Sequence, residues 1–201
     1  MLAIIDYGAG NLHSVKNALD FLGAESVVTS EKSVILSADK VILPGVGAFG
    51  DAMAELNKSG LDETIKEVVK KGTPILGICL GMQLFFDESE ETPGVKGLGI
   101  LGGKFLKIPK GEGLKIPHMG WNNLLMNKDS KILKDLGSEP YVYFVHSYYL
   151  EPEDPDDVSA FALYGKKIAV SAERDNIFLT QFHPEKSGDA GLKILKNFLE
   201  V

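Results

Sequence analysis

The only cysteine of the chain, Cys79, lies in the segment GICLG at residues 77–81. The apolar residues 74–78 before it predict a buried strand, and residues 82–86 after it predict a helix. A small-x-nucleophile-x-small turn between a strand and a helix holds the middle side chain on a sharp bend, with glycines where a Cβ would clash. The N-terminus of the following helix favours a thiolate. A lone cysteine can also be a small buried hydrophobe, but this context indicates a nucleophile.

A thiol nucleophile needs a base, and His183 is the best placed of the four histidines. It follows an apolar strand-like segment and stands two residues before Glu185, with Pro184 between them. Extended backbone sends residues i and i+2 to the same side, and proline biases the residue before it toward extended geometry. A carboxylate beside an imidazole sets its tautomer and supports the imidazolium. The alternative is a surface His and Glu at a strand end.

A nucleophile of this kind also needs donors for an oxyanion. The backbone N–H of Leu80, directly after the cysteine, can supply one donor. A second can come from the glycine-rich segment 44–50, in which Val46 and Gly47 follow the predicted third strand. Ligands bind at the carboxyl ends of parallel strands, which favours a binding role over a plain glycine-rich connection.

Composition narrows the class of protein. At 201 residues, 44% hydrophobic and 24% charged, the sequence predicts one α/β domain over residues 1–201. A net charge of −7 argues against nucleic-acid binding. The single cysteine fits a reducing compartment, no apolar stretch is long enough for a membrane span, and the first residues predict a strand rather than a signal peptide. We therefore expect a cytoplasmic protein.

The order of the elements predicts the type of sheet. In the first half, strands at Leu2–Ile5, Ser26–Thr29, 40–43 and 74–78 alternate with helices, which indicates a parallel sheet covered on both faces. After Gly97, short β-like runs predict antiparallel strands that decorate or extend the sheet: 103–108, 141–145, 161–163, 168–172 and 177–181. Leucines at 192, 195 and 199 predict a final amphipathic helix.

Taken together, the elbow motif from Gly77 to Gln83 and the late His183 and Glu185 resemble the class I (triad) glutamine amidotransferases. The resemblance covers essentially the whole chain. It implies a flavodoxin-like α/β fold: a central, mostly parallel sheet flanked by helices, with additional antiparallel strands in the second half. It further implies that Cys79 forms a γ-glutamyl thioester from L-glutamine, that His183 acts as base and then acid, and that Glu185 orients it. No cofactor and no metal are implied.

Within that family, residues 6–12 (DYGAGNL), 44–49 (PGVGAF) and 118–122 (HMGWN) are similar to the glutaminase subunits of imidazole glycerol phosphate synthase. The similarity implies a heterodimer with a (βα)₈-barrel cyclase subunit that consumes the ammonia. It also implies that Gln83 holds the amino-acid end of glutamine and that Gly47 approaches its amide. Ser147 and Tyr148 would line the substrate pocket, and Lys186 would face the partner.

Two further residues have alternatives that the sequence leaves open. Trp121, the only tryptophan, lies in a Gly/Asn-rich segment that predicts a turn, where an exposed indole would serve as an interface anchor; it can also fold over its own core. His118 is a rival base, but no acidic residue lies within several positions of it.

Three other functions also remain open at this stage. The chain can be a triad glutaminase that serves a different synthase, or a cysteine hydrolase of the peptidase or deglycase kind. A flavodoxin-like binding module without catalytic activity is the third. The late His-Pro-Glu motif counts against the cysteine hydrolase.

Overall fold

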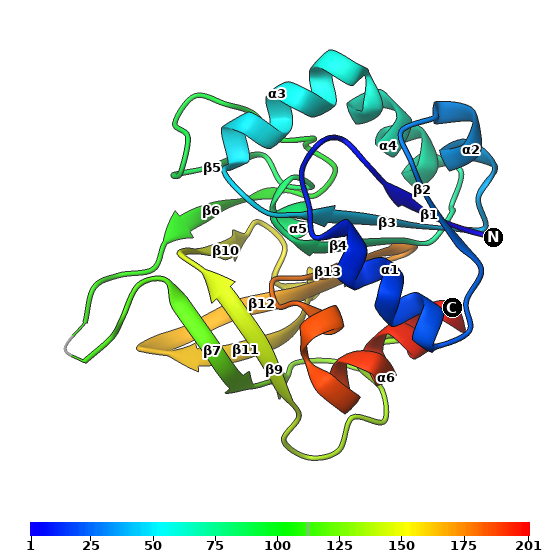
Figure 1. Cartoon of the computed structure of the whole chain (residues 1–201). Helices are drawn as coiled ribbons and strands as arrows, with labels where there is room; N and C mark the ends of the chain where they lie inside the picture. The colour runs from blue at the N-terminus through cyan, green and yellow to red at the C-terminus, as the bar shows by residue number, and fades with distance from the viewer. Residues whose placement is uncertain (112) are drawn as a thin grey trace.

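A computed structural model describes residues 1–111 and 113–201 (Figure 1). The helices are α1 (Leu12–Phe21), α2 (Lys32–Ser37), α3 (Phe49–Ser59), α4 (Leu61–Lys70), α5 (Leu80–Gln83) and α6 (Gly188–Leu199), with 3-10 turns η1 (Pro155–Asp157) and η2 (Pro184–Lys186). The strands are β1 (Leu2–Ile5), β2 (Ser26–Thr29), β3 (Lys40–Gly45), β4 (Ile75–Cys79), β5 (Glu88–Ser89), β6 (Gly103–Lys107), β7 (His118–Asn123), β8 (Leu125–Met126), β9 (Tyr141–His146), β10 (Tyr148–Pro152), β11 (Val158–Tyr164), β12 (Lys166–Arg174) and β13 (Ile177–Thr180).

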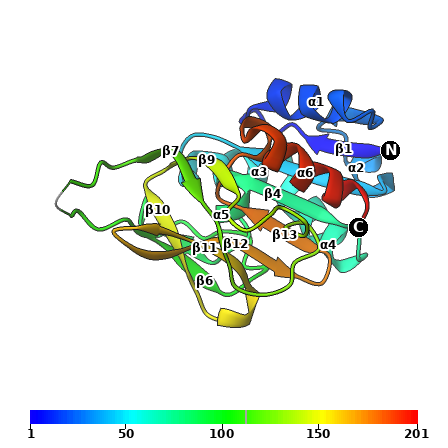
Figure 2. The same ribbon diagram turned by 90° about the horizontal axis from the view of Figure 1, so that it is seen from below.

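In the described residues, eleven strands form one sheet, whose main path runs β2-β1-β3-β4-β13-β12-β10-β6-β5. The pairs from β2 to β13 are parallel, and those from β13 to β6 are antiparallel. β7 and β9 form a separate antiparallel pair (Figure 2). The structure thus confirms the predicted fold: a mostly parallel half flanked by helices, followed by antiparallel strands.

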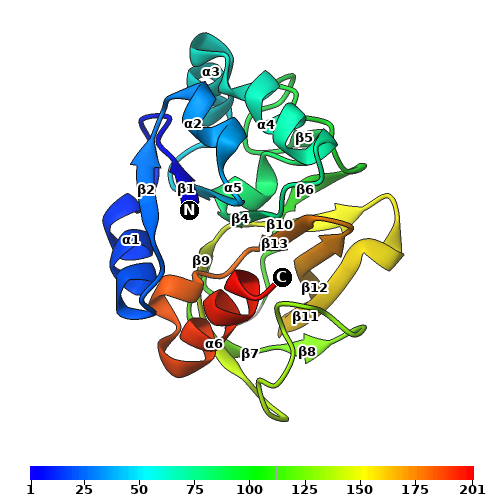
Figure 3. The same ribbon diagram turned by 90° about the vertical axis from the view of Figure 1, so that its right-hand side faces the viewer.

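Two hydrophobic layers cover the sheet, one on each face. Alternation along each strand sends neighbours to opposite layers: Ala3 and Ile5 of β1 pack with α3 and α4, whereas Leu2 and Ile4 pack with α1 and α6. Figure 3 shows these two groups of helices on opposite sides of the sheet. Because both faces are buried, the central strands are apolar throughout, which is why the sequence identified them.

The structure corrects four details of the sequence prediction. The segment 177–181 was expected to be one of the antiparallel strands, but β13 is also parallel to β4 and completes the parallel half of the sheet. The segment 141–145 becomes β9, which pairs with β7 outside the main sheet. The helix expected over 82–86 is one turn, α5, that starts at Leu80. The last helix begins at Gly188, four residues before its first predicted leucine.

Several elements were not predicted from the sequence. They are α2, β5, β7, β8 and β10. α2, β5 and β8 are short, and β10 lacks an alternating apolar pattern. β7 (HMGWNN) carries a glycine and two asparagines, which are poor strand formers. Its pairing with β9 over six residues supplies what its own propensity does not.

The glycine after the cysteine allows close packing between β3 and α5. A Cβ on Gly81 would lie 2.0 Å from the backbone oxygen of Leu43 in β3, closer than any real contact.

We therefore expect Gly81→Ala to lower the free energy of unfolding by about 3 kcal/mol, since the clash is with backbone that cannot move aside. Urea denaturation measures the change. At Gly111 an added Cβ would meet only the flexible end of Leu114, so Gly111→Ala is the control, and equal effects of the two variants would contradict the packing.

Candidate active site

Cys79 is the last residue of β4, and its backbone is strained. Its φ of 56° and ψ of −111° lie in a region that side chains other than glycine rarely occupy. Gly77 and Gly81 permit this bend, because a Cβ on either one would come within 3 Å of neighbouring atoms. The strand-to-helix elbow predicted from the sequence is therefore present. The following helix is a single turn, so its dipole is smaller than expected from the sequence.

His183 follows β13, and the register of that strand brings it to the cysteine. β13 pairs in parallel with β4, with Thr180 opposite Ile78. The ring nitrogen Nδ1 lies 2.8 Å from Oε1 of Glu185, and both side chains are almost fully buried. Glu185 reaches the ring from the 3-10 turn η2, not from extended backbone as the sequence suggested. The predicted contact is therefore confirmed, although the geometry that produces it is a tight turn.

Charge keeps a proton on His183. Burial is the largest single influence and disfavours the imidazolium, but the Cys79 sulfur and the Glu185 carboxylate together raise the pKa of His183 to about 10. The second ring nitrogen, Nε2, is buried and has no hydrogen-bond partner in the part of the chain that the structure describes. The Cys79 sulfur nevertheless contributes to the raised pKa of the ring. At neutral pH the imidazolium therefore stands beside the cysteine.

A pair of glutamines lies next to Cys79. Nε2 of Gln83 donates to Oε1 of Gln181 over 3.1 Å, and Nε2 of Gln181 lies 3.6 Å from the Cys79 sulfur. The sequence predicted a role for Gln83 but gave no signal for Gln181, which only the pairing of β13 with β4 brings near. Oε1 of Gln83 is buried and has no hydrogen-bond partner among the described residues, and Gln83 lines the cleft.

The cleft in front of Cys79 has a volume of about 290 Å³. The predicted residues Val46, Gly47, Leu80, Gln83, Ser147, Tyr148 and His183 all line it. The lining also includes residues that the sequence did not single out as contacts: Glu91, Pro117, Val145 and His146. Glu91 is held by the backbone N–H of Phe49, which donates to its carboxylate over 2.8 Å. A small polar molecule with an ammonium group would find acceptors here.

The glycine-rich segment after β3 forms the wall of the cleft opposite the histidine. Gly45 stands opposite Cys79 in the parallel pairing of β3 with β4. Val46 is 41% exposed, and Gly47 has a φ of +100°, which favours glycine. Beneath this segment, the hydroxyl of Tyr7 is buried and has no hydrogen-bond partner within residues 1–111 and 113–201. Burial, with a smaller effect from Cys79, raises the pKa of that phenol well above its usual value. The expected position beside the elbow is confirmed.

Comparison with known proteins identifies this arrangement. The family model for class-I glutamine amidotransferases matches residues 3–201. The chain belongs to this family. It is 52% identical over its whole length to the imidazole glycerol phosphate synthase subunit HisH of Methanothermobacter thermautotrophicus, covering 98% of that protein, and 51% identical to HisH of Chlorobaculum tepidum, with full coverage of both. The resemblance stated from the motifs is therefore confirmed.

A solved structure shows the same fold as this amidotransferase. A crystal structure described as a glutamine amidotransferase superposes with a TM-score of 0.78 at 20% identity, covering 98% of this chain and 97% of that one. In the described part of the amidotransferase, no helix is long and apolar enough to cross a membrane.

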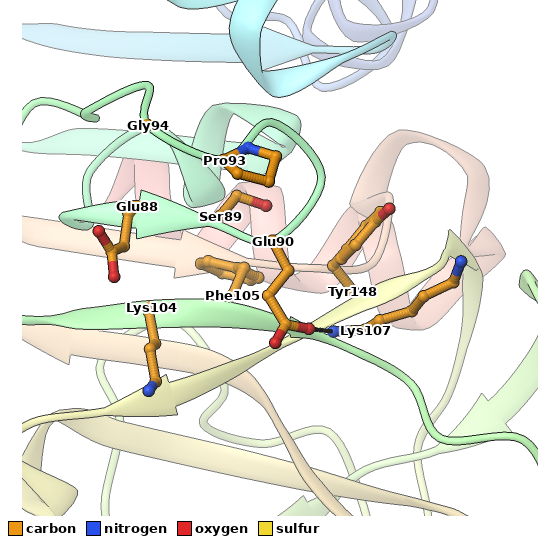
Figure 4. Close-up of a pocket in the computed structure, with 9 residues that line it drawn as sticks. All are labelled: Glu88, Ser89, Glu90, Pro93, Gly94, Lys104, Phe105, Lys107 and Tyr148. Carbon is orange, nitrogen blue, oxygen red and sulfur yellow. Dashed lines mark hydrogen bonds between the residues drawn. The ribbon is translucent and has the colours of Figure 1, made fainter.

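A second hollow of about 510 Å³ adjoins the amidotransferase cleft and shares Tyr148 with it (Figure 4). It is lined by Glu88, Ser89, Glu90, Pro93, Gly94, Lys104, Phe105, Lys107 and Tyr148. Figure 4 shows the Glu90 carboxylate turned toward Lys107, whose backbone N–H donates to it over 2.7 Å. The lining carries both signs of charge, and Glu88 and Lys104 form ion pairs with Lys96 and Glu151 outside the hollow. Cys79 is not among the lining residues. The smaller cleft, which Cys79 lines, is therefore the candidate active site.

The two residues predicted to face a partner are exposed. Trp121 is 55% exposed and lies on β7, a strand rather than the predicted turn, with its ring edge-on to Tyr143. Lys186 is exposed on η2, next to Glu185. By contrast, His118 is buried and bonded to His146, and burial lowers its pKa to about 4. It is therefore not a rival base.

The raised pKa of His183 predicts a pH dependence of stability. A histidine whose pKa rises from about 6.5 in the unfolded chain to about 10 in the fold stabilises it fully below pH 6.5, and this contribution is lost as the pH rises through 10. Glu185→Gln removes one cause of the rise, so stability should fall less steeply between pH 7 and pH 10 in this variant. Urea unfolding at a series of pH values measures the slope. Glu139→Gln changes an exposed carboxylate and serves as the control; a slope in Glu185→Gln equal to that of the wild type would refute the pairing.

Proposed function

We propose that this chain is the glutaminase subunit of an imidazole glycerol phosphate synthase. It would hydrolyse L-glutamine to glutamate and ammonia and pass the ammonia to a (βα)₈-barrel cyclase subunit in a heterodimer. The observation that carries the proposal is the strained Cys79 beside a charged His183 that is bonded to Glu185. Full-length identity of about half to HisH subunits supports the choice of synthase. We treat residues 1–201 as one amidotransferase domain, working in the cytoplasm.

The first half of the proposed reaction uses the proton on His183. The Cys79 thiolate attacks the carbonyl carbon of the glutamine side-chain amide, and the electron pair of the C=O bond moves to oxygen. When the tetrahedral intermediate collapses, the C–N bond breaks, the imidazolium gives its proton to the departing nitrogen, and ammonia leaves. A γ-glutamyl thioester remains on Cys79. Glu185 accepts from Nδ1 throughout, so the ring keeps its orientation.

The second half returns the enzyme to its starting state. Neutral His183 takes a proton from water as the hydroxyl oxygen attacks the thioester carbon. The C–S bond then breaks, the γ-carboxylic acid loses its proton to solvent as glutamate leaves, and the thiolate and imidazolium are restored. The negative oxygen formed in both halves would be held by backbone N–H groups of Leu80 and the Val46–Gly47 segment, all of which line the cleft.

Substrate binding is assigned to the polar groups around the cleft. The α-ammonium group of glutamine has three donors, which match Oε1 of Gln83 and the carboxylate of Glu91. The backbone and hydroxyl groups of Ser147 and Tyr148 would meet the rest of the amino-acid end. These groups match the charged amino-acid end of free glutamine.

The partner would be the subunit that uses the ammonia. In that assembly, ammonia is joined to a phosphoribulosyl intermediate, and the products are imidazole glycerol phosphate and an aminoimidazole carboxamide ribotide. The exposed Met119 and Trp121 on β7, Tyr141 on β9 and Val46 beside the cleft offer apolar contact area for it, and Lys186 offers a charge. We further propose that partner binding reorients the Val46–Gly47 peptide to complete the oxyanion hole, since Gly47 tolerates both backbone hands.

The main alternative is a triad glutaminase that serves a different synthase. It would use the same cleft, so only the partner separates the two. The cysteine hydrolase and the non-catalytic module are separated from both by their products: a peptidase or deglycase would not release ammonia from free glutamine, and a binding module would form no thioester.

Removing the sulfur tests the chemistry. We expect Cys79→Ala to lower glutamine turnover about 10⁴-fold or more, as loss of a triad member does elsewhere, while the thermal midpoint stays close to that of the wild type. Mass spectrometry of wild-type protein quenched during turnover should show one added γ-glutamyl group, which the variant lacks. His183→Ala should also lose activity, whereas His13→Ala, which alters an exposed histidine, should not. Turnover retained without the sulfur would exclude the mechanism.

Adding the barrel subunit with its nucleotide ligand tests the assignment to this synthase. Turnover of the chain alone should be slow and should rise strongly on mixing. Trp121→Ala should weaken the affinity for the barrel by about 10- to 100-fold, as truncation of an aromatic anchor does, and leave unstimulated turnover unchanged. Phe21→Ala removes another exposed aromatic side chain, on α1, and should have no such effect. High turnover that does not respond to the barrel would favour the alternative synthase.

A further inference from the structure

Two buried histidines that the proposed mechanism does not use form a hydrogen-bonded chain behind the cleft wall. Nδ1 of His118 lies 2.9 Å from Nε2 of His146, and Nδ1 of His146 lies 2.8 Å from the backbone oxygen of Tyr148. At the other end, Nε2 of His118 lies 3.4 Å from Nδ2 of Asn122. Both nitrogens of His146 are thus engaged, so this ring is not available as a base, although it lines the cleft.

Asn122 fixes the direction of each hydrogen bond between the two histidines and Tyr148. Its Nδ2 donates to the backbone oxygen of Leu163 over 2.9 Å, and its Oδ1 accepts from the backbone N–H of Asn123 over 2.9 Å. These two backbone groups fix which end of the amide is nitrogen, and that end faces His118. Nε2 of His118 must therefore accept, which puts its proton on Nδ1. Nδ1 of His118 then donates to Nε2 of His146, which puts the proton of His146 on Nδ1, and that Nδ1 donates to the backbone oxygen of Tyr148.

The surroundings keep both rings neutral, as the chain requires. The ring of His118 is stacked between Phe144 and Tyr164, at centroid distances of 4.6 and 3.9 Å. Burial lowers the pKa of His118 to about 4, and burial, with smaller effects from neighbouring histidines, lowers that of His146 to about 3. A proton on Nε2 of either ring would face a donor instead of an acceptor. Only the tautomer with the proton on Nδ1 of both rings therefore satisfies every hydrogen bond.

The last hydrogen bond of the series, from His146 to Tyr148, lies where the backbone passes from one sheet to the other. β9 belongs to the two-stranded sheet and ends at His146, whereas β10 belongs to the main sheet and begins at Tyr148. Ser147 is the single residue between them, and its oxygen accepts from the N–H of Ile108 over 2.9 Å. The bond from His146 to the oxygen of Tyr148 spans this crossing, and the same residues form the cleft wall.

We propose that His118 and His146 are positioning residues for glutamine binding. Through a fixed sequence of donors they set the backbone of Ser147 and Tyr148, which bounds the substrate cleft. The inference rests on the proposed function, because the cleft is taken to bind glutamine. The series of hydrogen bonds begins at Asn122 on β7, beside the exposed Trp121. The substrate wall and the proposed partner face are therefore built on one pair of strands, β7 and β9.

The test compares two substitutions at His118. His118→Leu keeps an apolar side chain between the aromatic rings but removes the donor to His146, whereas His118→Asn places an amide nitrogen where Nδ1 stood. We expect KM for glutamine to rise about tenfold in His118→Leu with kcat within about twofold of the wild type, and His118→Asn to restore KM to within about twofold. Alkylation of Cys79 by iodoacetamide should be unchanged in both variants. Equal KM values for the two variants, or a loss of stability with unchanged KM, would overturn the proposal.

A second measurement is independent of turnover. Nitrogen-15 NMR of the wild-type chain at pH 7 should show protonated Nδ1 and unprotonated Nε2 on both rings, and amide hydrogen exchange at Tyr148 should be slower in wild type than in His118→Leu. A charged ring, or a proton on Nε2 of either histidine, would overturn the inference. If the wild type failed to hydrolyse glutamine, the proposed function would fall, and these two readouts would still decide whether the histidines hold the wall.

Discussion

The backbone bend at Cys79 is the constraint around which this fold is organised. A residue with a side chain holds a positive φ there only because its surroundings leave no other conformation. Those surroundings are specific: Gly81 packs against the backbone of β3, and Gly77 packs against Leu179 of β13. Larger residues at either glycine would separate the strands that hold the bend. The strain at the nucleophile is therefore maintained by two of the most buried strands of the sheet.

The electrostatics of the site follow from the same burial. An imidazole that is 1% exposed would normally be neutral, but Glu185 and the cysteine sulfur reverse that tendency. His118 and His146 are just as buried and lack such partners, so their pKa values fall instead. The pKa values of these buried histidines thus move in opposite directions, and the deciding factor is the presence of Glu185 and the Cys79 sulfur beside His183 rather than the degree of burial.

How far the sequence predicts this structure depends on the range of the interactions. The four parallel strands of the first half, the elbow and the His183–Glu185 contact were predictable, because each rests on an apolar run or on residues at most a few positions apart. Gln181 was not, since its position next to Cys79 depends on a pairing across 102 residues. The strand β7 was missed for a similar reason: its residues favour a turn, and only β9 makes them a strand. Glu91 lies within no predicted motif, and its place in the cleft depends on a hydrogen bond from the backbone N–H of Phe49, 42 residues away.

The position of β13 has a consequence for how the chain reaches its native state. This strand comes near the C-terminus, yet it lies in the middle of the sheet, between β4 and β12. Until it inserts, β4 lacks one of its neighbours, and the elbow has neither the side chain of Leu179 against Gly77 nor His183 nearby. Contacts over such long separations form slowly, because closing a large loop costs entropy before the pairing repays it. A nascent chain in which β13 has not yet been synthesised therefore has Cys79 at the end of β4 without His183 beside it.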